Sequence, residues 1–172
     1  MHSPGPLIET ERMTLRPWRA GDLEAFHEIW GDPDVIWWGA NESIEVTRTM
    51  FERLLASHAG WPAGVRWYAM VERTTGAIIG DVLLQPARFV EGIEIGWHLC
   101  RGAWGRGLAT EAALAARDQA FAEGAVERIH AIVALENERS LRVVRKLGLE
   151  PVRDMEYAGL PHRLFAIDRP PG

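Results

Sequence analysis

The sequence has a single cysteine, Cys100, and no apolar run long enough to cross a bilayer. One thiol excludes an internal disulfide and a metal site built from several thiolates, and we expect no metal. A membrane-spanning helix needs roughly 20 consecutive apolar residues, so no membrane partner is expected. Residues 1–13 lack a basic region followed by an apolar stretch and a small-residue cleavage site. A cytoplasmic location is therefore expected.

A surplus of positive charge is also lacking. The 172 residues carry 19 Lys and Arg against 24 Asp and Glu, which gives a formal net charge of −5. An acidic chain does not fit a large footprint on nucleic acid, and no nucleic-acid partner is expected. Internal repeats, low-complexity tracts and a linker between two halves are absent from the sequence. Residues 1–172 are therefore expected to form one domain.

Apolar periodicity predicts a mixed order of helices and strands. Helices are expected at 23–30, 43–58, 108–123 and 137–147. Strands are expected within 11–19 and at 66–72, 77–84, 92–99 and 128–135, with two more in 149–168. Along residues 92–99 the apolar residues alternate with Glu94, Gly96 and His98, which share the opposite face of that strand. Chemistry is expected on this second face.

A glycine-rich turn leaves the strand at 92–99 and opens directly into the helix at 108–123. Glycines let the backbone approach an anion, and the free amides of a first helical turn can bind a pyrophosphate. The turn has no P-loop lysine, so a nucleotide γ-phosphate with magnesium is not expected there. The alternative is a tight connection without a ligand.

Asn137-Glu138-Arg139-Ser140 follows a short strand and starts the next helix. Helical spacing places Asn137, Ser140, Val144 and Leu147 on one face of the helix. The side chain of Ser140 can therefore face a cleft bordered by the preceding strand. The alternative is that Asn137 only caps the helix and Ser140 only fills its first turn.

Together these motifs resemble the GNAT superfamily of acyl-coenzyme-A-dependent N-acyltransferases. The segments at residues 94–97, 104–112 and 137–140 resemble in particular the branch of ribosomal-protein N-terminal alanine and serine acetyltransferases, as does the opening segment at 7–16. The resemblance covers nearly the whole chain. It implies an α/β (mixed α+β) fold, with about four helices around a central, mostly antiparallel sheet of about seven strands. That sheet is expected to splay between the strand ending at Leu99 and the strand ending near Leu135.

The resemblance implies that acetyl-CoA lies in this split. The pantetheine arm would pair with the main chain of Trp97, His98 and Leu99, where an amide near Leu99 would polarise the thioester carbonyl. Asn137 is expected to touch the same arm, and Ser140 to lie near the sulfur. The pyrophosphate would lie on the turn and the helix start, at Trp104, Gly105, Arg106, Gly107, Leu108, Ala109 and Thr110.

Two residues depart from the family pattern. Trp104 stands where glutamine or arginine is usual, so its side chain brings no charge to a phosphate. Val144 stands where many members have a tyrosine that acts as general acid. Ser140, directly or through water, is therefore our candidate to protonate the leaving thiolate.

The attacking amine must lose a proton, and Glu94 is our candidate base, through water. The alternative for Glu94 is a structural ion pair on a solvated strand face. His98, two positions further along, is the second candidate for the base, and its alternative is a hydrogen-bonded structural role.

The acceptor is expected to be a small-molecule amine or a protein N-terminus, bound beside Trp37 and Trp38 in the loop between the first two helices. The alternative for this pair is a loop anchor. A homodimer is compatible with the resemblance.

Two other functions stay open. An acyl-CoA-binding sensor without turnover would explain the missing tyrosine. A Rossmann-like dinucleotide-binding module would use Gly105 and Gly107, although the third glycine of that fingerprint is missing.

Overall fold

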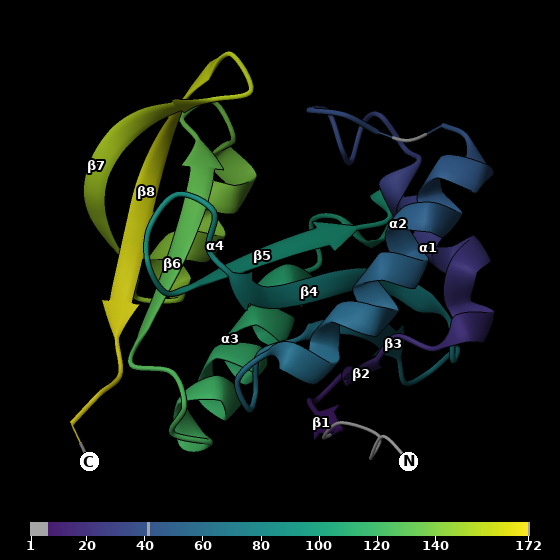
Figure 1. Ribbon diagram of the computed structural model, residues 1–172, viewed down its shortest axis with the longest axis horizontal. Helices are drawn as coiled ribbons and strands as arrows, with labels where there is room; N and C mark the ends of the chain where they lie inside the picture. Colours follow the sequence, from purple (N-terminus) through teal and green to yellow (C-terminus); the bar gives the residue numbers. More distant parts are fainter. Residues whose placement is uncertain (1–6, 41, 172) are drawn as a thin grey trace.

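A computed structural model of the protein describes residues 7–40 and 42–171, and its eight strands form one sheet in the order β1-β2-β3-β4-β5-β6-β8-β7 (Figure 1). All neighbouring strands are antiparallel except β5 and β6, which run parallel. This order excludes the parallel sheet of a dinucleotide-binding fold. The strands are β1 Ile8–Glu9, β2 Met13–Pro17, β3 Trp67–Glu72, β4 Ile78–Pro86, β5 Ile93–Leu99, β6 Arg128–Ala134, β7 Glu150–Tyr157 and β8 Leu160–Asp168.

Four α-helices cover the two faces of the sheet. They are α1 Leu23–Trp30, α2 Ile44–Ser57, α3 Leu108–Ala122 and α4 Glu138–Lys146, and three short 3-10 turns lie at Ala20–Asp22, His58–Gly60 and Arg101–Ala103. The mixed α/β fold expected from the sequence is confirmed. The short strand β1 is the one addition, because the chain reverses after Thr10 and Ile8 pairs with Leu15 on β2. No helix of the described ranges has the length and apolar character that crossing a membrane requires.

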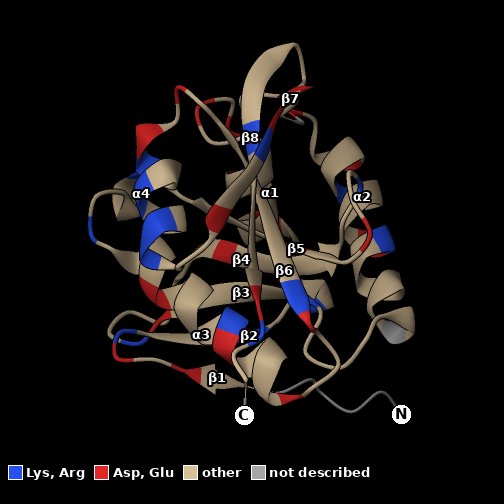
Figure 2. Ribbon diagram, turned by 90° about the vertical axis from the view of Figure 1, so that its left-hand side faces the viewer, with Lys and Arg blue, Asp and Glu red and all other residues tan. Residues whose placement is uncertain are grey.

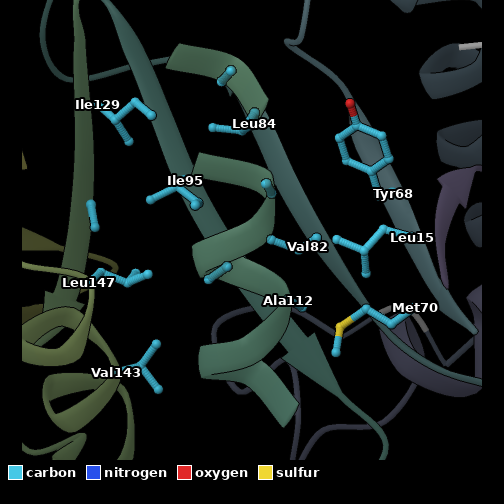
Figure 3. Close-up of a cluster of buried hydrophobic side chains, with 14 of the residues drawn as sticks. Leu15, Tyr68, Met70, Val82, Leu84, Ile95, Ala112, Ile129, Val143 and Leu147 are labelled. Atoms are coloured by element: carbon cyan, nitrogen blue, oxygen red, sulfur yellow. The ribbon is translucent and has the colours of Figure 1, made fainter. Parts of the chain in front are cut away.

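Helices α3 and α4 pack on one face of the sheet over an aliphatic core (Figure 3). Small side chains on α3 allow its backbone to approach the strands closely, and Ala112 and Ala116 are completely buried. From α4, Val143 and Leu147 close the same core over Ile129 of β6. This core fixes the angle at which both helices meet the diverging strands.

Helices α1 and α2 pack on the other face over an aromatic core. Phe26 lies 4.7 Å from Phe51, and Trp30 lies 5.1 Å from Trp67, measured between ring centroids. Each such pair contributes about 1 kcal/mol beyond its buried area. The rigid aromatic core holds both ends of the loop that joins α1 to α2.

Strand β5 separates the two cores, because its side chains alternate between the two faces. Ile93, Ile95 and Leu99 belong to the core under α3. Glu94 and His98 therefore point to the side of α1 and α2, as the alternation predicted.

Candidate active site

The sheet opens between β5 and β6. These strands pair only at Ile93 with Ile129 and at Glu94 with His130. Beyond that point β5 continues to Leu99 and β6 to Ala134, with no further pairing between them in the described residues. The predicted split is therefore present between the expected strands.

The edge of β5 that faces the split carries free backbone groups. The amide of Cys100 donates to the carbonyl of Ile79 on β4 at 2.9 Å. Because successive peptide groups of a strand point in opposite directions, the groups of Trp97 and Leu99 point away from β4, toward the split. The peptide groups of His98 point toward β4 instead. An extended arm carrying amides can add to this edge as a further strand would.

At the end of β5 the glycine turn leads into α3. Gly105 and Gly107 have φ of 74° and 77°, a left-handed conformation that glycine adopts without steric cost, and Gly107 is the N-cap of α3. The first amides of the helix have no partner within the helix and carry the positive end of its dipole. This geometry suits an anion such as a pyrophosphate.

Polar and charged side chains from the connection between β1 and β2 and from the end of β3 anchor the turn. Glu111 of α3 accepts hydrogen bonds from Thr10 and from the guanidinium of Arg12, the latter at 2.7 Å. Arg12 also donates to the carbonyl of Arg106 at 2.8 Å. The Arg106 guanidinium pairs with Glu72 at 2.6 Å, so this side chain is directed away from an anion on the helix amides.

Trp104 closes one wall of the split. Its indole N–H donates to the carbonyl of Leu99 at 2.8 Å, so of the free groups on this edge the Leu99 carbonyl already has a partner. The guanidinium of Arg139, in the first turn of α4, lies 4.6 Å from the centroid of the Trp104 ring. The neutral tryptophan thus holds a cation beside the turn through its π face.

Asn137 caps α4, as predicted: its side-chain oxygen accepts from the amide of Ser140 at 3.1 Å. The Ser140 hydroxyl accepts from the indole N–H of Trp97 at 3.3 Å and so lies against β5 from the side of α3 and α4. Val144, where a tyrosine is usual, is completely buried. Ser140 is therefore the hydroxyl that α4 brings to β5.

Glu94 lies where β5 and β6 separate, on the opposite face of the sheet from Ser140. One of its carboxylate oxygens accepts a short hydrogen bond from Gln85, whose own oxygen accepts from the indole N–H of Trp67 at 3.0 Å. The other oxygen is buried and has no hydrogen-bond partner among the described residues. Burial raises the pKa of Glu94, against the opposing effect of the Gln85 hydrogen bond. Glu94 forms no ion pair with any residue of the described ranges.

Aromatic rings from three parts of the chain meet on the Glu94 side. Trp38 lies 5.6 Å from His98, and Trp37 lies 5.3 Å from Trp38. Trp37 is 40% exposed and stacks on His162 of β8, with 5.9 Å between the ring centroids and 25° between the planes. Tyr157 of β7 meets the edge of the same histidine at 5.4 Å. The loop between α1 and α2 therefore reaches across to the last hairpin.

Sequence reasoning missed His162 and Asp81. His162 lies within the last strand. Alternation alone would assign it to one face of the sheet, but it does not indicate which ring the imidazole contacts. Asp81 is a fully buried carboxylate on β4 whose pairing with His98 depends on the register of two strands. A charged residue inside an otherwise apolar strand was the available signal.

A metal centre has no support in the described part of the chain, where no three His, Cys, Asp or Glu side chains cluster around a possible ion.

Comparison with known proteins agrees with this geometry. The family model described as "Acetyltransferase (GNAT) domain" matches residues 12–150. The uncharacterized N-acetyltransferase YoaA of Bacillus subtilis is 30% identical over 152 residues, which cover 84% of this chain and 83% of that protein.

Two solved structures share the fold. A putative GNAT-family acetyltransferase from Bordetella pertussis superposes with a TM-score of 0.83 at 21% identity, covering 94% of this chain and 98% of that one. RimL, a ribosomal L7/L12 alpha-N-protein acetyltransferase in complex with coenzyme A, superposes with a TM-score of 0.79 at 17% identity, covering 95% and 98%. The chain is thus an acyltransferase and belongs to the GNAT family of acetyltransferases, whose members bind acetyl-CoA.

Proposed function

We propose that this chain transfers the acetyl group of acetyl-CoA directly to a primary amine while both substrates are bound. The observation that carries the proposal is the open edge of β5, which leads straight into the glycine turn and the free amides of α3. An extended amide-bearing arm fits the first feature, and a pyrophosphate fits the second. These two features lie in the order in which the parts of acetyl-CoA follow one another.

Positive charge beside the turn supports this orientation. Arg139 is exposed at the start of α4, and it has no carboxylate partner within the described ranges. Figure 2 shows further Lys and Arg residues along the same helix. A guanidinium held by Trp104 would attract the phosphates that the neutral tryptophan itself cannot contact. The amide of Leu99 would donate to the thioester carbonyl oxygen as it gains negative charge.

Proton transfer is assigned to the two polar groups that flank the split. Glu94, through one water molecule on its unpartnered oxygen, would accept a proton from the ammonium form of the acceptor. Ser140 would donate to the leaving sulfur from the opposite face of the sheet. The direct attack of nitrogen on the thioester needs no acyl group on Cys100, whose thiol has its pKa raised by burial and is a poor nucleophile.

The acceptor would enter on the side of Trp37 and Trp38. One of these indoles lies beside His98 and the other beside His162, and both can contact the apolar or cationic body of an amine. A protein N-terminus and a small-molecule amine both fit this description. RimL, similar in fold, is named for the N-terminal acetylation of a ribosomal protein, which supports including peptides among the acceptors to be tested.

A thiol-release assay tests the proposed function. The protein is incubated with acetyl-CoA and, in separate reactions, a peptide with a free N-terminus, an aromatic amine and a polyamine, and the acetylated product is identified by mass. We expect thiol release with at least one class. Binding of acetyl-CoA without release for every amine would instead support the sensor without turnover.

The role of Ser140 has its own test. Ser140→Ala should lower kcat by no more than about 10²-fold, because the thiol of coenzyme A is acidic enough to leave with little help. Ser140→Thr keeps a hydroxyl and should retain most of the activity. Unchanged turnover in Ser140→Ala would remove Ser140 from the mechanism.

A further inference from the structure

Asp81 is a carboxylate without a role in the mechanism described so far. Its side chain is completely buried in the middle of β4. One oxygen accepts from the indole N–H of Trp30 at 2.7 Å, and the other accepts from Nδ1 of His98 at 2.8 Å. Burying a carboxylate is costly unless donors compensate it, and here two donors do so. The structure thus places a buried, doubly hydrogen-bonded carboxyl group directly behind His98.

This arrangement fixes the state and the orientation of the imidazole. Asp81 and His98 are partners in the register of β4 and β5. An ionised carboxylate can only accept, which would place the hydrogen on Nδ1 of His98 and, in the neutral imidazole, leave the lone pair on Nε2. The ring is held by Trp30 at 4.7 Å and Trp38 at 5.6 Å. Nε2 has no hydrogen-bond partner among residues 7–40 and 42–171, and the side chain keeps 11% of its surface exposed.

The acetyl transfer removes protons from nitrogen in two steps. An ammonium group that becomes an amide loses two protons from nitrogen, and the departing sulfur takes up one. One proton must leave before nitrogen can attack, and the second leaves as the C–N bond forms and the C–S bond breaks. Glu94 and His98 lie on one face of β5 with only Gly96 between them. Two acceptors are thus placed along one face of β5, and His98 is the one that lies next to Trp38.

We propose that His98, oriented by Asp81, is the second proton acceptor of the acetyl transfer. This inference rests on the proposed function. Glu94 accepts the proton of the ammonium, and Nε2 of His98 accepts the proton that nitrogen loses as the C–N bond forms. The bonding electrons of the C–S bond stay on sulfur, which takes the hydroxyl proton of Ser140, and solvent replaces that proton on Ser140. Asp81 is a positioning residue: it stabilises the imidazolium and touches no substrate. Glu94 and His98 then each return a proton to solvent, so that one proton is released net for each acetyl group transferred.

The first test is chemical rescue. His98→Ala should lower kcat by about 10²-fold or more, while the affinity for acetyl-CoA, measured by calorimetry, stays unchanged. Added imidazole should restore thiol release in His98→Ala and should not restore it in Glu94→Gln. A folded His98→Ala variant that binds acetyl-CoA but gains nothing from imidazole would overturn the proposal.

The second test distinguishes a positioning role of Asp81 from a purely structural one. It can also be carried out if His98→Ala alone does not fold. Removing the imidazole leaves Asp81 with Trp30 as its one remaining donor, so the double variant Asp81→Asn, His98→Ala removes the buried charge as well. Asp81→Asn should lower kcat in the wild-type background with an unchanged KM for acetyl-CoA. In the His98→Ala or His98→Gln background, Asp81→Asn should lower kcat no further. An equal loss in both backgrounds would assign Asp81 a purely structural role and contradict the inference. Absence of thiol release from the wild type would instead contradict the proposed function itself.

Discussion

The two oxygens of the Glu94 carboxyl group differ in their hydrogen bonding. Gln85 fixes one oxygen, and the other is buried without a partner in the described residues. The side chain thus has a defined orientation and one open acceptor position. Burial raises its pKa, which brings the carboxylate closer to the basicity that accepting a proton from an ammonium requires.

Replacing Glu94 by Gln should separate activity from stability. The amide can still accept from Gln85, but it cannot accept a proton, so kcat/KM should fall by about 10²-fold or more. In the wild type the acidic limb of kcat/KM against pH should lie above the ordinary glutamate pKa of about 4.3, and Glu94→Gln should lose that limb.

The expected stability of Glu94→Gln follows from the direction of the pKa shift of Glu94. A carboxyl whose pKa is raised by folding holds its proton more tightly in the folded state, so its ionisation lowers the free energy of unfolding as pH rises above the unfolded pKa. Glu94→Gln removes this cost, and urea unfolding at neutral pH should show no loss of stability. A large loss would mean that Glu94 is a structural residue.

Single residues could be predicted where the signal is local. The alternation of β5 placed Glu94 and His98 on one face, and the position of Asn137 at the start of a helix identified it as a cap. The bond between Asp81 and His98 could not be predicted, because it joins two strands whose register depends on the whole hairpin. The stack of Trp37 on His162 joins segments 125 positions apart in the sequence, which periodicity does not relate.

At the scale of elements, helix α3 links cofactor binding to the core. Its N-terminus follows the glycine turn, and its buried residues between Leu108 and Phe121 are all alanines. Any side chain that pushes the helix away from the strands would also move the amides of its first turn. Close packing of α3 is therefore a condition for the site as well as for stability.

Ala116→Leu tests this packing. The side chain of Ala116 is completely buried against the sheet, and overpacking of such a position costs about 1–3 kcal/mol. We expect the urea midpoint to fall and the affinity for acetyl-CoA to decrease. Ala122→Leu, at the exposed last position of the same helix, is the matched control and should change neither. Equal midpoints for the two variants would show that α3 does not pack as described.

The order of helices and strands was well predicted from the sequence, because each element carries its own periodicity and its own turn residues. Residues 43–58 illustrate the limit. Ser43 occupies the predicted N-cap of α2, but its hydroxyl donates to Glu45 instead of accepting from a backbone amide. Strand β1 escaped prediction, since two residues are too few to show a period.

At the scale of the whole molecule, aromatic contacts connect the two halves of the splayed sheet. Trp38 contacts His98 on β5, and Trp37 stacks on His162 of β8, so neighbouring residues of one loop reach both sides of the opening. On the other face, the indole of Trp97 donates to Ser140 of α4. The contact between Trp37 and His162 lies on the side from which we propose that the amine enters.

Trp37→Ala should affect the acceptor alone. Losing one aromatic contact should raise the KM for the amine by about 2- to 10-fold, while the dissociation constant of acetyl-CoA stays the same. Val46→Ala truncates another exposed apolar side chain, on α2, and should leave the KM unchanged. If Trp37→Ala shifts both constants equally, Trp37 holds the fold of the split and does not contact the amine.

The most direct test of the central claim is calorimetric titration of acetyl-CoA into wild type, Gly105→Glu and Gly76→Glu. Both glycines have left-handed φ, 74° and 73°, and a Cβ atom at either would meet no atom within 4 Å beyond its chain neighbours, so the two variants share similar backbone strain and the same added charge. They differ in place, since Gly105 lies in the turn before α3 and Gly76 in the hairpin between β3 and β4. We predict one equivalent bound by the wild type and by Gly76→Glu, and none by Gly105→Glu, whose carboxylate would repel the pyrophosphate. A folded wild type that binds no acetyl-CoA, or equal binding by all three proteins, would contradict the account.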